Sequence, residues 1–291
     1  MKPSYKLLLL FLAIQSIGFA QDYKQRLHTI DIKHYNLSLA VNDSTDIIDA
    51  NMQINLKFRR IVNEFQLDLV NKDTVSGKGM TIDSIYQNNV PVDFIHENNK
   101  ITIKPKHPFL GIAYTYSIKY SGEPKDGLII SANKHGDRTF FGDNWPDRAH
   151  HWIPCIDHPS DKATIEYHIT APNHYQVIAN GHPAEKTNIN DYQDQYHWET
   201  SVPLPTKVMV IGIARFAVQE VGTIHNIPVS TWVYPQTKEQ GFTDFAIANN
   251  ILDFFIEKIG DYPYAKLANV QSTTRYGGME NAGNIFYFEN S

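Results

Sequence analysis

Residues 277–281 carry the most specific chemical pattern in the 291-residue chain, the sequence Gly-Gly-Met-Glu-Asn. Paired glycines such as Gly277 and Gly278 leave a stretch of backbone without side chains, so another chain can lie beside it as an added strand. The carboxylate of Glu280 would then meet a cation at the end of that chain, through a charge-assisted hydrogen bond that contributes roughly 1.5–3 kcal/mol. The pattern predicts a peptide-binding edge that selects free α-ammonium groups. The alternative is a surface turn with a solvated glutamate.

Other residues with reactive or metal-binding side chains form weaker patterns. Cys155 is the only cysteine, so no internal disulfide can form, and we expect it to be a small buried residue. His150 and His151 are adjacent, and adjacent side chains on a strand point to opposite faces, so we expect no shared ion. Asp157 is expected at a structural corner, paired with Lys162.

A zinc-binding H-E-x-x-H helix is absent from the sequence. In that motif two histidines share one helix face and the glutamate activates the metal-bound water. The chain has 13 histidines, of which no two are four residues apart and none follows His225. A G-x-S-x-G elbow, a phosphate loop and a dinucleotide fingerprint are also absent. We therefore expect no catalytic residues and no metal ligands in this 291-residue sequence.

The elements that must position these residues are mainly β-strands. From residue 35 to about residue 218, apolar side chains recur at every second position, as in half-buried strands. Turn-forming pairs such as Asn88-Asn89 and Asn180-Gly181 separate them. This spacing predicts an all-β domain at residues 21–220, an antiparallel saddle or sandwich. The continuous apolar run at 208–213 predicts a strand buried on both faces.

The pattern changes after about residue 220. Residues 243–259 show helical spacing, with Thr243 or Asp244 able to cap the start and Gly260 suited to the end. The apolar face of this predicted helix comprises Ala248, Ile251, Leu252, Phe255 and Ile259. Residues 221–291 hold too little to close a core, so we predict the incomplete start of a second, α+β domain.

The first 20 residues have the layout of a signal peptide. Lys2 and Lys6 precede an apolar run at 7–14, and Gly18-Phe19-Ala20 forms a small-residue ending. The run is shorter than the roughly 20 residues that span a bilayer, and no later stretch approaches that length. We expect export to the periplasm or extracellular space, with no transmembrane segment after signal cleavage. A net charge of −5 without a basic cluster argues against nucleic acid as a partner.

Three segments resemble the gluzincin zinc aminopeptidases, the family of aminopeptidase N and the leukotriene hydrolases. Residues 277–281 are similar to its Gly-x-Met-Glu-Asn motif. Residues 152–163, Trp-Ile-Pro-Cys-Ile-Asp-His-Pro-Ser-Asp-Lys-Ala, are similar to its Pro-Cys-x-Asp-x-Pro-x-x-Lys-Ala segment, and residues 261–267 to the Tyr-Pro-x-x-Lys-Leu that precedes the glycine motif. The segments follow the family's order and spacing, so the resemblance extends from about Ile30 to the C-terminus.

The resemblance implies an all-β saddle followed by a thermolysin-like catalytic domain, with zinc in the full-length protein. It implies that Glu280 binds the free amine of a peptide substrate, that Gly277 and Gly278 line the groove beside the substrate backbone, and that Met279 and Asn281 support the loop. Peptides with a free N-terminus would be the substrates, shortened by one residue at a time.

Trp145 is a departure from the family pattern. The second amine-anchoring side chain of the family is a Glu or Gln twelve residues before Asp157, where this chain has Trp145. An indole has no lone pair with which to accept a hydrogen bond from an ammonium. Its face can make a cation–π contact, Asp143 or Asn144 can shift into place, or Trp145 only packs the pocket floor.

The favoured hypothesis is that the chain is the N-terminal portion of an exported zinc metallo-aminopeptidase. It would supply the substrate-amine recognition loop and be inactive alone, because the family's zinc helix follows the glycine motif by a few tens of residues. The alternative is a non-catalytic, exported, β-rich binding or scaffold protein that retains the family's front end.

Overall fold

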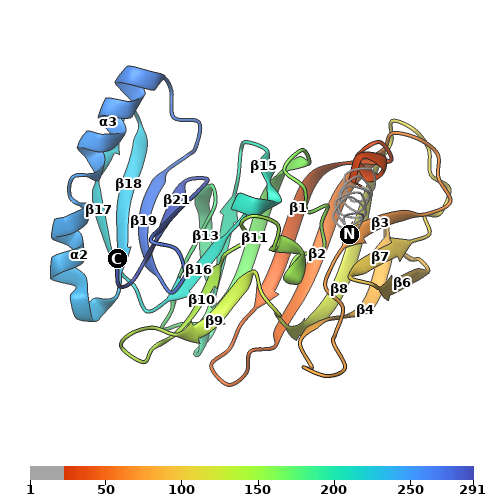
Figure 1. Cartoon of the computed structure of the whole chain (residues 1–291), viewed down its shortest axis with the longest axis horizontal. Coiled ribbons are helices and arrows are strands. Elements are labelled where there is room, and N and C mark those ends of the chain that lie inside the picture. Colours follow the sequence, from red (N-terminus) through yellow and green to blue (C-terminus); the bar gives the residue numbers. More distant parts are fainter. Residues whose placement is uncertain (1–22) are drawn as a thin grey trace, which may run out of the picture.

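A nine-stranded sheet forms the centre of the computed structural model, which describes residues 23–291 (Figure 1). The predicted signal peptide lies outside the described residues. Neighbouring strands run antiparallel except for β1 and β11, which are parallel. In spatial order the strands are β13 (His182–Asn190), β14 (Gln193–Glu199), β11 (Lys162–Pro172), β1 (Ile30–Ala40), β2 (Ile48–Phe58), β8 (Ala113–Glu123), β4 (Gly79–Gln87) and β5 (Val90–Pro91), with β15 (Leu204–Pro205) beside β11.

The strands of this sheet bury every second side chain. In β2 the buried positions alternate with exposed or half-buried ones along all 11 residues, as the apolar spacing predicts. Two asparagine pairs, Asn88-Asn89 and Asn98-Asn99, adopt positive φ in hairpin turns, a conformation that asparagine tolerates. The sheet therefore has one apolar face toward the core and one polar face toward solvent.

Two smaller sheets pack against the large one. A four-stranded sheet is ordered β12 (Gln176–Ala179), β16 (Ile211–Ala214), β10 (Arg138–Gly142) and β9 (Leu128–Ala132), and a three-stranded sheet is ordered β3 (Phe65–Asp68), β7 (Lys100–Ile103) and β6 (Phe94–Glu97). All of β16 is buried, which confirms a strand within the apolar run, although residues 206–208 form the 3₁₀ turn η2 (Thr206–Val208).

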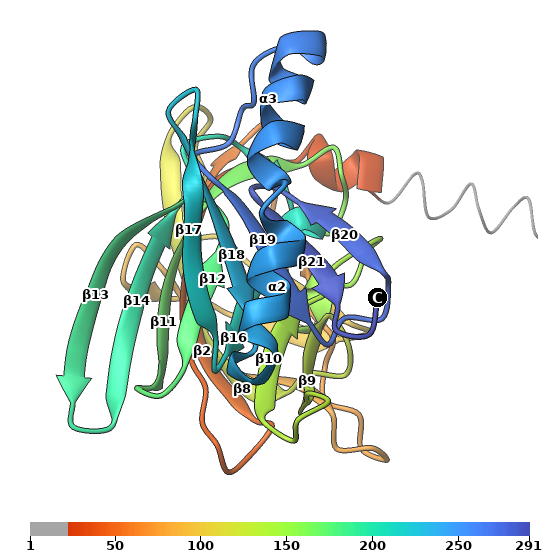
Figure 2. The same cartoon turned by 90° about the vertical axis from the view of Figure 1, so that its left-hand side faces the viewer.

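A five-stranded mixed sheet follows, and helices cover one of its faces (Figure 2). Its order is β17 (Ala217–Ile224), β18 (Ile227–Val233), β19 (Leu267–Ser272), β21 (Asn284–Phe288) and β20 (Gly278–Asn281), and the helical elements are η3 (Pro235–Thr237), α2 (Lys238–Phe245) and α3 (Ala248–Ile259). Its other face meets the four-stranded sheet, since the rings of Phe141 and Phe286 lie 5.5 Å apart.

The predicted single helix at 243–259 is observed as two consecutive helices. The Thr243 hydroxyl donates to the Glu239 carbonyl inside α2, so Thr243 does not cap α3. Gly260 ends α3 at a positive φ of 129°, as predicted. Within residues 23–291, no helix is both long and apolar enough to span a membrane.

The segment between β10 and β11 forms a buried corner, with two corrections to the sequence expectations. His150 and His151 lie in the 3₁₀ helix η1 (Ala149–His151), not on a strand. Asp157 accepts hydrogen bonds from His150 Nδ1 and Thr206 Oγ1, both at 2.7 Å, so the expected pair with Lys162 is wrong. Lys162 instead begins β11 as an exposed residue.

The side chains at this corner are largely shielded from solvent. Burial opposes the positive charge of His150, but the hydrogen bond and the negative charge of Asp157 raise the pKa of His150. Cys155 is fully buried, as expected.

Two buried polar side chains fix the turn between β20 and β21 to the preceding sheets. The Lys266 ammonium donates to the Ala179 carbonyl at the end of β12 (2.9 Å) and to Asn284 Oδ1 at the start of β21 (2.6 Å). The Asn180 amide donates to the Ala282 carbonyl in the turn at 2.8 Å. Burial lowers the pKa of Lys266 to about 7. The position of the β20–β21 hairpin is therefore set by the β domain.

Packing between the sheets predicts a large effect of truncating Phe141. Its side chain is fully buried and contacts the rings of Phe216 and Phe286. Phe141→Ala should lower the free energy of unfolding by about 3–5 kcal/mol. Phe109→Ala, the same substitution at a residue that is 59% exposed, should change it by less than about 1 kcal/mol. Urea denaturation measures both values, and equal losses would contradict this account of the core.

The buried Lys266 predicts a pH dependence of stability. Its folded pKa of about 7 lies below the unfolded value of about 10.4, so between these values the unfolded chain binds more protons. The contribution of Lys266 to the free energy of unfolding therefore rises with pH across this window, by at most about 1.4 kcal/mol per pH unit. Lys266→Met removes that contribution. In urea denaturation, the free energy of unfolding of wild type minus that of the variant should increase from pH 7 to 9.5. Parallel pH profiles of the two proteins would refute a lowered pKa for Lys266.

Candidate functional site

Strand β20 is an edge strand that carries four of the five motif residues. It pairs antiparallel with β21, with Gly278 opposite Tyr287 and Glu280 opposite Ile285. It is the last strand of its sheet, so within residues 23–291 no strand pairs with its outer side. The backbone groups on that side are available to an added strand.

The two motif glycines face open space. A Cβ atom added to Gly278 would meet no atom within 4 Å, and one added to Gly277 would meet only the Ser291 hydroxyl at 3.7 Å. Neither glycine has a positive φ. Internal packing and backbone conformation therefore do not require glycine at either position. What the glycines provide is access to the strand from outside.

Glu280 is exposed on the face of the sheet that carries the helices. Its register partner Ile285 packs with the cluster that includes Leu252 of α3. Burial raises the pKa of Tyr287, and the negative charge of Glu280 raises it further. Among residues 23–291, no hydrogen bond or ion pair involves the Glu280 carboxylate. It is free to receive a cation from outside.

The other two motif residues face the interior. Met279 is half-buried, and Asn281 is buried and donates to the Met279 carbonyl at 3.5 Å. Phe286, opposite Met279, is fully buried against Phe141. This alternation is consistent with a supporting role for Met279 and Asn281.

The structure brings Trp145 next to the motif. Its ring meets the ring of Tyr276, the residue before Gly277, edge to face at 6.0 Å, and 41% of Trp145 remains exposed. The two aromatic side chains therefore form a partly open wall beside the glycine strand. A partly exposed indole face is available to a cation.

Asp143 and Asn144 are both held in other contacts. Asp143 forms an ion pair of 2.6 Å with Arg148, and its side chain is 1% exposed. Burial raises the pKa of Asp143, although the charges of Arg148 and Arg275 oppose this. Asn144 donates to the Thr206 carbonyl at 3.1 Å and accepts from Trp152 Nε1 at 2.8 Å. Moving either side chain toward the motif would leave buried polar groups without partners.

Among residues 23–291, no set of metal ligands lies beside the edge strand. In the described part of the chain, the group of His, Cys, Asp or Glu side chains with converging ligand atoms is Glu166, His168 and His197, which lie on β11 and β14. None of them lies on a helix at the spacing of the H-E-x-x-H motif. The residues present therefore do not fit the zinc site that the resemblance implies, and no catalytic step follows from them.

Sequence reasoning missed the roles of four residues. Lys266 belongs to the Tyr-Pro-x-x-Lys-Leu segment, but its burial and its acceptors appear only in the fold. Tyr276 gave no signal beyond its place before the glycines. His168 and His197 come from strands whose pairing the sequence does not specify.

Comparisons with known proteins agree with the resemblance. Human glutamyl aminopeptidase is 30% identical over 151 residues, which are 50% of this chain and 16% of that protein. Leucyl aminopeptidase of Saccharolobus solfataricus is 24% identical over 219 residues, 72% of this chain and 27% of that protein. The chain thus spans less than a third of the length of either relative.

A solved structure shows the same fold over most of the chain. A mutant M1 zinc metallopeptidase from Deinococcus radiodurans, bound to a Tyr-Ser-Ala substrate, superposes with a TM-score of 0.77 at 19% identity. The superposition covers 90% of this chain and 61% of that one. At this identity the likeness is evidence for the fold alone.

The family assignment comes from the β domain. Residues 32–208, more than half of the chain, match the peptidase M1 N-terminal domain. They run from β1 to η2 and contain the nine-stranded sheet. The chain therefore belongs to the M1 peptidase family, and residues 32–208 form its N-terminal domain.

Proposed function

We propose that the chain is part of an exported zinc aminopeptidase that removes single residues from the free N-terminus of peptides, and that residues 277–281 recognise the substrate's amine. The observation that carries this proposal is the unpaired carboxylate of Glu280 on an edge strand whose glycines face open space. Membership in the M1 family supports it. So does the relative from Deinococcus radiodurans, which binds a Tyr-Ser-Ala substrate.

In this proposal the substrate backbone lies along β20 and forms main-chain hydrogen bonds with its outer side. Its α-ammonium then reaches the Glu280 carboxylate, while Trp145 and Tyr276 flank the chain end. An internal peptide amide carries no charge and would leave Glu280 uncompensated. The arrangement favours chain ends over internal bonds.

Zinc would supply an activated water to such an enzyme. Because these 291 residues contain no H-E-x-x-H sequence, we place the ligands of the catalytic zinc in a part of the protein outside them. The contribution of the residues described here is binding and orientation. Export is proposed from the basic start, the apolar run at 7–14 and the small-residue ending of residues 1–20.

Amine recognition can be tested on the 291-residue chain. A short peptide with a free N-terminus should bind more tightly than its N-acetylated form, because only the first can make the charge-assisted hydrogen bond to Glu280. Glu280→Gln should reduce the affinity for the free peptide about 10- to 150-fold, which corresponds to roughly 1.5–3 kcal/mol. Calorimetric titration or NMR shift titration measures these affinities.

The matched control is Glu239→Gln, which removes an exposed carboxylate from α2. It should leave both affinities unchanged. If Glu280→Gln binds the free peptide as tightly as wild type, Glu280 does not hold the amine.

Catalysis can be tested by extending the chain with its downstream reading frame. We expect hydrolysis of alanyl- and leucyl-p-nitroanilide only in the extended protein, lost with a chelator and restored by zinc. The extended protein should also hold one zinc ion more per chain than the 291-residue chain does. An extended protein that binds peptides but lacks both activity and the extra zinc would indicate a non-catalytic binding or scaffold protein instead.

A further inference from the structure

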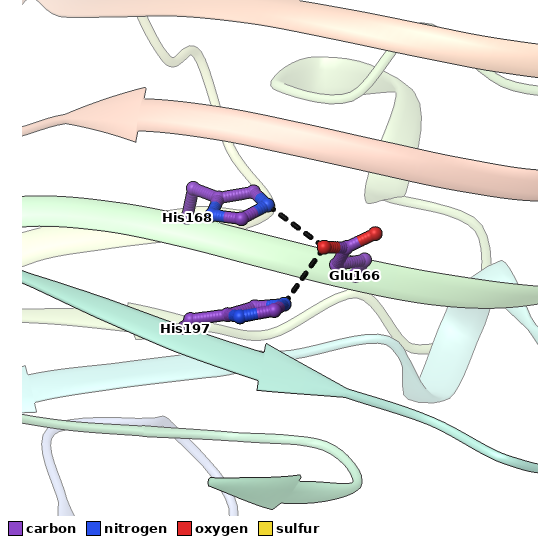
Figure 3. A group of neighbouring side chains, drawn as sticks. All are labelled: Glu166, His168 and His197. Carbon is purple, nitrogen blue, oxygen red and sulfur yellow. Dashed lines mark hydrogen bonds and ion pairs between the residues drawn. The ribbon is translucent and has the colours of Figure 1, made fainter. Parts of the chain in front are cut away.

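Two histidines and one glutamate converge on the polar face of the nine-stranded sheet (Figure 3). His168 on β11 and His197 on β14 are register partners, so their side chains lie side by side on the same face. Glu166 precedes His168 by two residues on β11 and therefore shares that face. The arrangement follows from strand pairing, and the strands give it a rigid base.

Both imidazoles direct their Nε2 atoms at one carboxylate oxygen. Glu166 Oε1 lies 2.9 Å from His168 Nε2 and 2.7 Å from His197 Nε2. The two rings are stacked, with centroids 4.3 Å apart and planes inclined by 19°. One ligand atom from each of the three side chains lies within 4.8 Å of the others.

Hydrogen bonding alone does not satisfy this group. His197 Nε2 is shielded from solvent and has no hydrogen-bond partner of acceptable geometry, despite its short distance to Glu166. A divalent cation between neutral imidazoles and the carboxylate would satisfy all three side chains.

Neighbouring residues orient the carboxylate. Asn36 on β1 donates to the second oxygen, Glu166 Oε2, at 2.9 Å, which leaves Oε1 facing the histidines. His34 Nε2 lies 3.6 Å from Oε2, while its Nδ1 contacts Thr164 Oγ1 at 2.8 Å. Partners that fix a ligand in this way are typical of protein metal sites. The side chains of the three ligands are each about one-quarter exposed.

We propose that Glu166, His168 and His197 bind a divalent cation of the zinc class on the outer face of the N-terminal domain. Two imidazole nitrogens and one carboxylate oxygen suit zinc and the neighbouring first-row metals better than magnesium or calcium. Metal–ligand bonds of about 2.0–2.2 Å in a tetrahedral site require ligand atoms about 3.3 Å apart. The distances from Glu166 Oε1 to the two Nε2 atoms, 2.9 and 2.7 Å, must therefore increase by roughly half an ångström when the ion binds. Three protein ligands leave a position for water.

The three ligands of this site lie on β11 and β14 of the N-terminal domain. The site departs from the sequence expectation that this chain holds no metal ligands. Bound metal would link two adjacent strands of the sheet. The proposal does not depend on peptide hydrolysis, so it is tested without activity.

The test is calorimetric titration of the metal-stripped 291-residue chain with Zn²⁺. We expect one equivalent to bind. His168→Gln, His197→Gln and Glu166→Gln should each weaken binding at least about 100-fold, since loss even of a partner that orients a ligand costs 10–100-fold. The control is His225→Gln, which removes an exposed histidine paired with Asp253 on another sheet and should bind as wild type does.

A second measurement on the unaltered chain guards against variants that misfold. X-ray absorption of the Zn²⁺ complex should show two imidazole nitrogens among the nearest ligands. Circular dichroism and urea midpoints establish whether each variant is folded. Absence of saturable binding in the wild type, unchanged affinity in a folded His197→Gln variant, or an all-oxygen coordination shell would overturn the proposal.

Discussion

A buried amine must have oxygen acceptors, and this requirement at Lys266 determines where strand β20 lies. The amine contacts the Ala179 carbonyl of the β domain and the Asn284 side chain of the β20–β21 hairpin at the same time. It also lies 5.1 Å from the Trp198 ring. Any shift of the hairpin away from β12 would leave this buried amine without oxygen acceptors, which costs roughly 1–3 kcal/mol. The hairpin is therefore positioned by the β domain.

The side-chain alternation of β20 places different residues on the two faces of its sheet. Met279 and Asn281 face the interior beside Phe286, which anchors the strand to the four-stranded sheet. Glu280 points to the opposite face, where α2 and α3 lie, and has no partner among residues 23–291. A short strand can in this way be fixed through the side chains of one face. The charged side chain on the other face and the outer backbone edge of the strand stay available.

The same alternation creates the polar face that carries Glu166, His168 and His197. Tyr167 and Ile169 alternate with Glu166 and His168 along β11 and are fully buried in the core. Glu166 and His168 must therefore face outward. Burial of one face of the sheet therefore arranges the polar side chains of the other in rows. Which histidines become neighbours depends on strand order, since β14 pairs directly with β11 although β12 and β13 lie between them in the sequence.

The sequence alone determined the mainly β architecture, the asparagine turns, the buried cysteine and the glycine motif, because these depend on local spacing and on the conformational preferences of single residues. The start of α3 was misplaced because no side chain caps it, so its boundary has no local signal. Only the tertiary structure decided that Asp157 pairs with His150 and Thr206 instead of Lys162, that Trp145 meets Tyr276, and that Lys266 is buried. Each of these contacts joins residues whose approach is set by strand order and sheet packing, which period-two patterning does not encode.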